Sequence, residues 1–341
     1  MNVKKNKGEE RPVIGGQAVV EGVMMKGPDT IAISVRRPNG SIARQSRTYV
    51  PLSKRHKWMG WPFIRGIVNM ASMLGIGLTI LDTASKMLLD GQTEEPSKFE
   101  KWLSEKLGKN VDKVVMGVAA VIAIALSVLL FMVIPSLIAN LVQNATGSTI
   151  LINLASGITR IIILICYIWI TAYIPDMKRV YMYHGAEHKS VFCHEARLPL
   201  TVENARKFST LHPRCGTSFL LLVMIIAVLL GAVSDELLKL IFGLTKITLP
   251  LRLLRTLITL PIVAGLSYEA LQSLAKSNHI VVRALRWPGL MMQHLTTKEP
   301  DDSMLEVALD ALTRVVPKPP NNADNMSIPV EAAAIAEETQ A

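Results

Sequence analysis

The stretch HGAEH places two imidazoles and a carboxylate close together in the chain, as His184, Glu187 and His188. Residues at positions i, i+3 and i+4 share one face of an α-helix, so a helix over 177–196 would align the three side chains. Two imidazoles one turn apart can bind one metal ion, and the carboxylate beside them can take a proton from water. This order, H-x-x-E-H, is the inverted zincin motif. The spacing therefore predicts His184 and His188 as metal ligands and Glu187 as a catalytic base.

A second pair of ligand types follows in LHPRCG, which supplies His212 and Cys215 at H-x-x-C spacing. The two pairs together offer three imidazoles and one thiolate, which are ligand types of tetrahedral zinc sites. Three interpretations stay open: no metal, a structural zinc closed by all four side chains, or an open catalytic metal site. A free Glu187 favours the catalytic site, because a closed structural site does not need a carboxylate beside it.

Four further side chains are candidates for the same site. Glu269, in SYEALQ near the end of an apolar run, is considered as another metal ligand, with pairing to a nearby arginine as the alternative. Glu21 is considered as a neighbour of the site, with an ordinary glutamate in a tight strand bend as the alternative. His194 and Glu195 are considered as residues that support the ligands.

The elements that position this chemistry belong to a very apolar chain. Its 341 residues are 50% hydrophobic and 19% charged, with a formal net charge of +10, and the mean hydropathy is +0.34. Soluble domains carry about 25% charged residues, so this composition indicates an integral membrane protein with soluble parts. The three cysteines do not form a disulfide framework.

Four apolar runs are long enough to cross the hydrocarbon core, which takes about 20 helical residues. They are 115–142, 150–175, 218–242 and 247–275. A fifth run, 66–88, is glycine-rich and barely long enough, so we interpret it as an interfacial or re-entrant helix. Arg160 lies inside a run, where a charge usually faces a partner or a cavity. For Arg252 and Arg255, snorkelling from near a helix end is the preferred interpretation.

The distribution of positive charge predicts the orientation. Residues 1–65 hold thirteen Lys and Arg against four Asp and Glu, and the 176–216 loop is also basic. The short loops 143–149 and 243–248 hold almost no charge. Positive segments stay in the cytoplasm, so four spans with both termini cytoplasmic satisfy every segment in a bacterial cell membrane.

The fold class that follows is mainly α: a polytopic membrane helical bundle with a small N-terminal β-hairpin region. Strands are predicted at 17–25, 30–37 and 41–50, the last two joined by an Asn-Gly turn. The divisions are a basic cytoplasmic region with strands (1–60), interfacial and amphipathic helices (61–114, with an amphipathic helix at 93–113), a first pair of spans (115–175), the His/Glu/Cys loop (176–216), a second pair of spans (217–275), a C-terminal region with a helix (276–316) and a disordered tail (317–341).

The loop after HGAEH is expected to fold back on it. A Leu-Pro break is followed by Thr201 as a helix N-cap, with Asn204 at the third helical position. A short helix from there runs back beside the first, and both flanking spans enter the membrane at one face. We therefore expect His212 and Cys215 to lie within reach of the same metal as the HGAEH histidines.

The chain resembles the YqhQ-like family of bacterial membrane proteins from about residue 12 to about residue 315. The stretches that carry the resemblance are GGQAVVEGVMMKGP, GWPFIRGIVNM, YHGAEHKSVFCHEA, LTVENARKFSTLHPRCGTSF, SYEALQ and TTKEPDD. The resemblance implies a domain of unknown function, usually described as a predicted metal-dependent enzyme, and it names no substrate. Carried over by residue, it implies a site of His184, Glu187, His188, His212 and Cys215, with Glu21 and Glu269 nearby.

The leading functional prediction is a membrane-bound, metal-dependent hydrolase with its site at the cytoplasmic face and Zn²⁺ as the expected metal. A lipid head group, a membrane-tethered peptide and a soluble polar metabolite all remain open as substrates. The alternative is a membrane scaffold or assembly factor with a structural metal site. The third choice is a transporter with a path lined by Arg160, Arg252, Arg255 and Glu269. The expected partner is a bilayer with anionic head groups. Nucleic acid is not expected, and homo-oligomerisation is left open.

Overall fold

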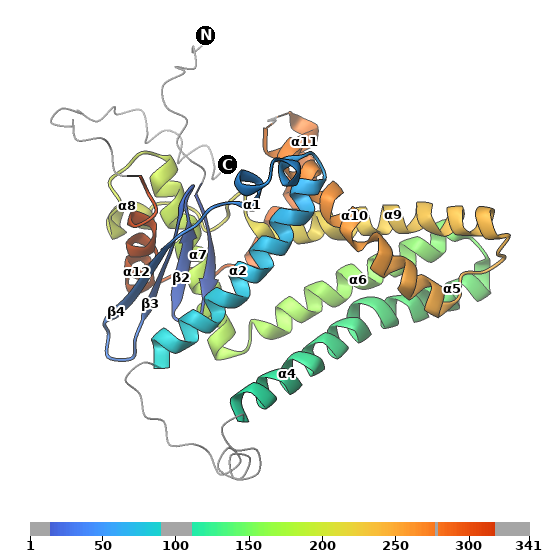
Figure 1. Ribbon diagram of the computed structural model, residues 1–341, viewed down its shortest axis with the longest axis horizontal. Coiled ribbons are helices and arrows are strands. Elements are labelled where there is room, and N and C mark those ends of the chain that lie inside the picture. Colours follow the sequence, from blue (N-terminus) through green and yellow to red (C-terminus); the bar gives the residue numbers. More distant parts are fainter. Residues whose placement is uncertain (1–13, 90–110, 277–278, 318–341) are drawn as a thin grey trace, which may run out of the picture.

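The computed structural model describes residues 14–89, 111–276 and 279–317. A four-stranded sheet with its covering helices lies at one end, and long helices extend from it as a bundle (Figure 1). This arrangement confirms the predicted fold class. The predicted tail after 317 and nearly all of the predicted amphipathic helix at 93–113 lie outside the described residues.

The sheet is antiparallel, with its strands in chain order. They are β1 (Gly15–Val19), β2 (Gly22–Lys26), β3 (Thr30–Arg36) and β4 (Ile42–Thr48). The predicted Asn-Gly turn joins β3 to β4, with Gly40 at a φ of 84°. The segment predicted as a single strand at 17–25 is instead a tight hairpin. Its two connecting residues end with Glu21 at a φ of 52°, which is the bend considered for that residue.

The two central strands are buried on both faces, so their side chains alternate between two cores. Val23 and Met25 of β2 face α7 (Pro175–Glu195) and α12 (Asp302–Thr313). Met24, between them, faces the opposite way, toward α2 (Ile64–Leu89). The sheet is therefore a middle layer between α7 and α12 on one side and α2 on the other.

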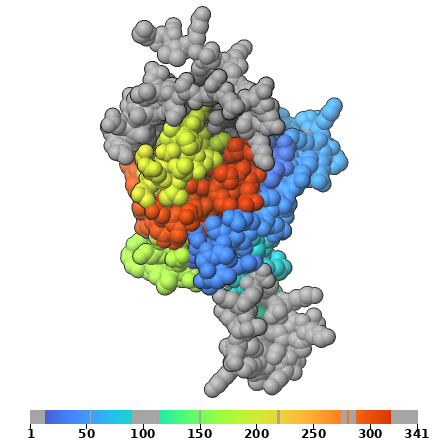
Figure 2. Space-filling model, turned by 90° about the vertical axis from the view of Figure 1, so that its left-hand side faces the viewer, coloured from blue at the N-terminus to red at the C-terminus, as the bar shows by residue number. Residues whose placement is uncertain are grey.

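Three distant parts of the chain build this sheet domain. Ile14, Tyr183 and Met304 belong to one buried core, although they come from the N-terminal region, the central loop and the C-terminal region. Seen from its end, the domain places α12 (red) between the strands (blue) and the segment around α8 (yellow; Val202–Arg206) (Figure 2). The polar loop between spans is thus part of a folded domain.

The bundle contains the four predicted apolar runs. Its elements are α4 (Val111–Val128), the π-helical turn η3 (Leu129–Val133), α5 (Ile134–Thr146), α6 (Thr149–Thr171), α9 (Gly216–Phe242) and α10 (Leu249–Lys276). The first three follow one another without a break and correspond to the predicted run 115–142. Together with α2, the described residues hold five helices long and apolar enough to cross a membrane.

The run 66–88 lies in one continuous helix, α2, which is among the helices long and apolar enough to cross a membrane. Its first turns pack on α10, where Gly66 approaches Gly265 closely. Its C-terminal half covers the sheet, with Ile80 and Ala84 in the core around Met24. The face turned away from the sheet exposes large apolar side chains, among them Leu74 and Leu78. The C-terminal half of α2 therefore belongs to the sheet domain, and the interfacial placement of this helix stays a prediction.

The preferred interpretation of two arginines is wrong. Arg252 and Arg255 are only 3% and 9% exposed, so they do not snorkel to a helix end. The hydropathy along one helix predicts how deep a residue lies in the bilayer, but it does not predict which side chains of other helices contact it. Here the neighbours are other polar side chains inside the bundle.

The short helices complete the chain. They are α1 (Leu52–Arg55), the 3-10 turn η1 (Lys57–Gly60), α8 and α11 (Ile280–Thr296). The predicted cap of α8 is confirmed, because the Thr201 side chain accepts a hydrogen bond from the Asn204 backbone N–H at 3.3 Å. A helix predicted within 276–316 is found as α12, with Asp301 as its N-cap. Helix α11 was not predicted, and it contains Pro288, a residue that usually ends helices.

Candidate metal centre

The helix α7 carries HGAEH through the interior of the sheet domain, as the i, i+3, i+4 spacing predicted. Glu187 is 7% exposed and His188 is 2% exposed, although both are polar. Buried polar side chains need partners or a function, because burial removes their hydrogen bonds to water. The contacts of these side chains therefore show what the cluster can do.

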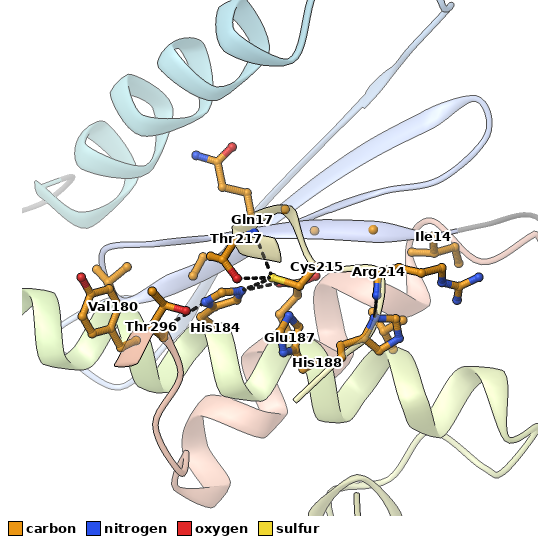
Figure 3. Close-up of a pocket in the computed structure, with 17 residues that line it drawn as sticks. Ile14, Gln17, Val180, His184, Glu187, His188, Arg214, Cys215, Thr217 and Thr296 are labelled. Carbon is orange, nitrogen blue, oxygen red and sulfur yellow. Dashed lines mark hydrogen bonds and ion pairs between the residues drawn. The ribbon is translucent and has the colours of Figure 1, made fainter. Parts of the chain in front are cut away.

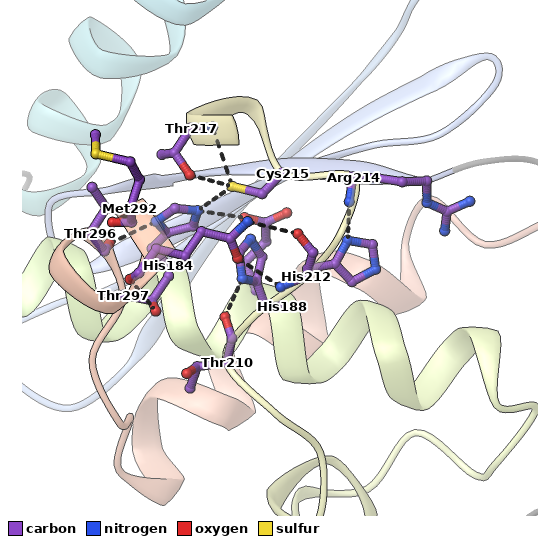
Figure 4. Close-up of polar contacts among 12 residues, drawn as sticks. His184, His188, Thr210, His212, Arg214, Cys215, Thr217, Met292, Thr296 and Thr297 are labelled. Carbon is purple, nitrogen blue, oxygen red and sulfur yellow. Dashed lines mark hydrogen bonds and ion pairs between the residues drawn. The ribbon is translucent and has the colours of Figure 1, made fainter. Parts of the chain in front are cut away.

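Three side chains converge on one point: His184 and His188 from α7, and Cys215 from the loop before α9 (Figure 4). Each offers one ligand atom, and these atoms lie within 4.8 Å of one another. His184 Nε2 and Cys215 Sγ lie 3.2 Å apart. Zinc lies about 2.0–2.1 Å from imidazole nitrogen and about 2.3 Å from thiolate sulfur, so small adjustments would fit one ion here.

Backbone carbonyls fix the tautomers of both histidines. His184 Nδ1 lies 2.8 Å from the carbonyl oxygen of Thr296, and His188 Nδ1 contacts the carbonyl oxygen of Thr210. A carbonyl can only accept, so each Nδ1 carries a proton and, in the neutral ring, each Nε2 keeps its lone pair. Metal-binding histidines commonly have such a partner on their other nitrogen. The two rings are thus oriented as electron-pair donors toward the cluster.

Cys215 is held at the start of a long apolar helix. It is the N-cap of α9, and its Sγ accepts a hydrogen bond from the Thr217 backbone N–H at 3.4 Å. The Thr217 hydroxyl lies 3.2 Å from the same sulfur. The thiol position is therefore fixed by the helix that joins the sheet domain to the bundle.

Glu187 lies against β1 and faces a cavity of about 410 Å³ (Figure 3). Its Oε2 lies 4.0 Å from His184 Nε2. At Gly16 a Cβ would lie 2.7 Å from Glu187 Cγ, so only glycine leaves room for the carboxylate in this place. A cavity of this size suits a small-molecule ligand. The wall includes the three clustered side chains, so a ligand in the cavity would meet them and Glu187 together.

Close packing of the backbone also requires the glycine inside HGAEH. A Cβ on Gly185 would lie 2.2 Å from the carbonyl oxygen of Lys298. The backbone N–H of Lys298 also donates to the Tyr181 carbonyl at 2.9 Å. The segment after α11 therefore crosses directly over α7, and this crossing brings the Thr296 carbonyl to His184.

His212 lies beside the cluster but has the opposite tautomer. Its ring centroid is 5.6 Å from that of His188. The Arg214 backbone N–H donates to its Nδ1 at 3.2 Å, so Nδ1 is an acceptor and, in the neutral ring, Nε2 carries the proton. Burial lowers the pKa of His212 to about 4, against a smaller raising effect of Glu187, so the ring is neutral near pH 7. Its Nε2 faces Glu195 Oε1 at 3.4 Å. The structure thus places Cys215, but not His212, among the converging ligand atoms.

The loop that carries Cys215 is clamped by Gln293 of α11. The Gln293 amide accepts from the His212 backbone N–H at 2.7 Å and donates to the His212 carbonyl at 2.8 Å. Gln293 is fully buried. Sequence reasoning missed this residue, as it missed Thr210 and Thr296, because backbone carbonyls and an isolated glutamine in MMQHLTT form no motif.

The remaining predicted site residues lie outside the converging group. Glu269 pairs with Arg65, at 2.6 and 2.7 Å, which is the alternative considered for it. Glu195 contacts Arg214. His194 is buried further along α7 and does not line the cavity.

Glu21 has a structural partner of its own. Its carboxylate accepts two hydrogen bonds from Arg179 on α7, and the Tyr183 hydroxyl lies 3.3 Å from Oε2. The hydrogen bond that Arg179 donates to Glu21 is the main cause that raises the pKa of the Arg179 guanidinium. Glu21 therefore ties the β1–β2 turn to α7, so its role is to hold the strand that carries Gly16.

Comparison with known proteins supports the resemblance noted in the sequence. A family model described as "Protein of unknown function (DUF1385)" matches residues 61–318. The chain is 34% identical over 311 residues to the "Uncharacterized protein YqhQ" of Bacillus subtilis (strain 168), across 89% of this chain and 92% of that protein. No solved structure matches.

Proposed function

The chain belongs to the DUF1385 family of proteins of unknown function, so its activity has to be inferred from its own site, and we propose that it is a membrane-bound, metal-dependent hydrolase. The proposed ligands are His184, His188 and Cys215, the proposed base is Glu187, and the proposed metal is Zn²⁺. The observation that carries the proposal is the convergence of three ligand atoms on the wall of a cavity that also contains a buried carboxylate.

The number of converging ligands favours catalysis over a purely structural site. Structural zinc sites are closed by four protein ligands, whereas catalytic sites keep three and leave one position open. His212 would be the fourth ligand of a closed site, but its Nδ1 accepts from backbone and its Nε2 faces Glu195. The open side of the cluster is the side on the cavity.

The chain's own residues have distinct roles in this proposal. A zinc ion held by the three ligands would supply a Lewis acid that lets water lose a proton near neutral pH. Glu187 is placed to accept that proton, because its carboxylate faces the cavity 4.0 Å from a ligand nitrogen. The carbonyls of Thr210 and Thr296 keep the imidazoles in the ligating tautomer. Gly16 keeps the space that the carboxylate occupies.

We further propose that the site faces the cytoplasm. The support is the excess of positive charge in residues 1–65, because the strands within this segment share a core with α7 and α8 of the 176–216 segment. Reporter fusions would test the orientation. Reporters after 317 should report cytoplasm and reporters at Thr146 and Lys246 the outside, and the opposite pattern would place the site on the external face.

The function is tested by hydrolysis of a panel of ester, amide and phosphodiester substrates by the purified protein, before and after chelation. We expect activity in the metal-loaded protein, and Glu187→Gln should keep the metal while activity falls by about 10²–10⁴-fold. Combined His184→Ala and His188→Ala should lose the metal itself, since too few ligands remain. His294→Ala is the control, because His294 is exposed and lies outside the cavity. Full activity in Glu187→Gln would contradict the proposed base.

A second function is favoured by the position of Cys215. Because this residue caps α9 while the histidines lie on α7, a metal would also join the sheet domain to the bundle. This arrangement would suit a scaffold or assembly factor with a structural metal. The same variants discriminate the two functions: a scaffold should lose stability on chelation and be indifferent to Glu187→Gln.

A further inference from the structure

A second buried polar cluster lies inside the helical bundle, away from the candidate metal centre. Its members are Arg160 on α6, Arg252 and Arg255 on α10, and Asp235 on α9. Asp235 follows Cys215 by twenty residues of α9, which is about 30 Å of helix. Charged side chains at this depth are costly, and in membrane proteins they usually mark a functional site.

One of the arginines has a carboxylate partner. Arg255 Nη2 lies 3.0 Å from Asp235 Oδ1, and both residues are almost fully buried. The guanidinium lies over Gly231, where a Cβ would approach Arg255 Nη1 to 2.7 Å. This glycine lets the charged group pack directly against α9.

The other two arginines bind uncharged acceptors. Arg160 Nε donates to the Phe131 carbonyl at 3.3 Å, and Phe131 lies in η3. A π-helical turn interrupts the regular hydrogen-bond ladder and is frequent at functional sites. Arg252 donates from its two terminal nitrogens to the Ser136 carbonyl at 3.4 Å and the Gln143 side-chain carbonyl at 3.3 Å. These neutral acceptors provide partners for guanidinium N–H groups, but they do not balance the positive charge of the two arginines.

Two donors remain without an acceptor. The Nε atoms of Arg252 and Arg255 are enclosed and make no hydrogen bond, although the residues are only 3% and 9% exposed. Both arginines line a small cavity together with Arg160 and the buried Ser156. A buried donor without a partner is destabilising, and this cost is larger for a charged group.

The charges and the size of this cavity indicate its ligand. Three guanidinium groups and one carboxylate leave an excess of positive charge in this part of the described bundle. The cavity has about 10 Å³ for the centre of a water-sized sphere, which is room for about one such particle. A polyatomic anion such as sulfate is too large for that space. A single small ion with negative charge would balance the excess and fill the cavity.

We propose that this cavity, lined by Arg160, Arg252 and Arg255, binds one monatomic anion of about the size of chloride. The guanidinium N–H groups are its donors, and Asp235 limits the net charge of the site. The proposal is independent of the metal-dependent activity, because the two sites share no residue.

The direct test is equilibrium binding of radioactive chloride to the purified, detergent-solubilised protein, with gluconate as the balancing anion. We expect saturable binding of about one chloride per chain. Arg252→Gln should weaken it by about tenfold or more, since one charged donor is lost. Lys246→Gln is the matched control, because Lys246 is a cation at the same end of the bundle that does not line the cavity. Absence of saturable binding in the folded wild-type protein would overturn the proposal.

A second variant keeps every charge and tests the geometry. Gly231→Ala displaces the Arg255 guanidinium, so chloride binding should weaken while the unfolding transition stays cooperative. This variant carries the test if Arg252→Gln does not fold. Bromide should compete with chloride and sulfate should not, because the cavity fits one small sphere. Equal competition by sulfate, or unchanged binding in Gly231→Ala, would also contradict the proposal. Cys215→Ser should leave chloride binding unchanged.

Discussion

The sheet domain and the helical bundle each bury a cluster of polar side chains, and the two clusters point opposite kinds of atoms inward. In the sheet domain, two imidazole nitrogens with free lone pairs and one sulfur converge. In the bundle, guanidinium N–H groups line the cavity. The first arrangement would suit a cation and the second an anion, so the two proposed sites are of opposite polarity.

The difference shows that the partners on the outer side of a cluster decide its chemistry. The carbonyls of Thr210 and Thr296 accept hydrogen bonds from Nδ1 of the clustered histidines, which leaves Nε2 of each ring facing the cluster. The carbonyls of Phe131 and Ser136 likewise accept hydrogen bonds from guanidinium N–H groups in the bundle, but arginine has further donors left. Histidine has two faces of opposite character, whereas arginine can only donate.

The two clusters also differ in how they carry charge. The side chains proposed as metal ligands in the sheet domain would bind an ion as neutral imidazoles and a thiolate. The bundle arginines are charged permanently, because the guanidinium group keeps its proton in proteins. The bundle site should therefore be sensitive to the loss of its one paired carboxylate.

The largest change in stability is expected for Asp235→Asn, which alters the bundle cluster and leaves the sheet-domain cluster unchanged. It leaves Arg255 without its buried partner, which should destabilise the protein by about 3 kcal/mol. Thermal unfolding in detergent with gluconate measures this loss, and chloride should restore part of it because a bound anion replaces the missing charge. Glu236→Gln is the control, since its side chain is 57% exposed. If chloride does not restore stability to Asp235→Asn, the result would contradict an anion bound beside Asp235.

A smaller effect is expected from the clamp that holds the Cys215 loop. Gln293→Leu leaves the buried N–H and carbonyl of His212 without partners, which should destabilise the protein by about 2 kcal/mol. Denaturation in detergent measures the change, and metal affinity should fall with it. Gln45→Leu is the control, because Gln45 is exposed on β4. Unchanged stability in Gln293→Leu would mean that the loop is held by other contacts.

The smallest expected effect sharpens the role of Glu187. Gly16→Ala places a Cβ 2.7 Å from Glu187 Cγ and 2.8 Å from the Met24 carbonyl oxygen, which should cost about 1 kcal/mol and displace the carboxylate. Its control is Gly15→Ala, because a Cβ at Gly15 meets no atom within 4 Å. Activity should fall in the first variant and stay in the second. Equal activity in both would show that the position of the carboxylate does not matter.

The local part of the candidate metal centre could be predicted from the sequence. The spacing of His184, Glu187 and His188 fixes their common helix face once α7 is recognised, and the Thr201 cap indicates where the chain turns back. His212 and Cys215 could not be separated in the same way. Their H-x-x-C spacing is compatible with two ligands, and only the turn at Arg214, whose N–H binds the imidazole, directs His212 away.

The non-local parts were beyond the sequence. Gln293 comes from a helix with an internal proline and has no motif, yet it clamps the loop from 81 residues away. Arg252 and Arg255 were interpreted singly as snorkelling residues, because the apolar pattern does not show that α9 brings Asp235 beside them. The five long helices were visible in the sequence as apolar runs. The sheet is buried on both faces because α2 packs against one of them, and the sequence does not show that contact.

The central claim is that His184, His188 and Cys215, without His212, hold one metal ion with an open position. The most direct measurement is the visible and near-ultraviolet absorption of the purified protein loaded with Co²⁺. We expect one cobalt per chain with a tetrahedral spectrum and a thiolate-to-cobalt charge-transfer band. The band should disappear in Cys215→Ser and persist in His212→Gln. A spectrum that loses its tetrahedral character in His212→Gln would contradict the three-ligand site, and absence of cobalt binding by the wild-type protein would contradict the metal centre itself.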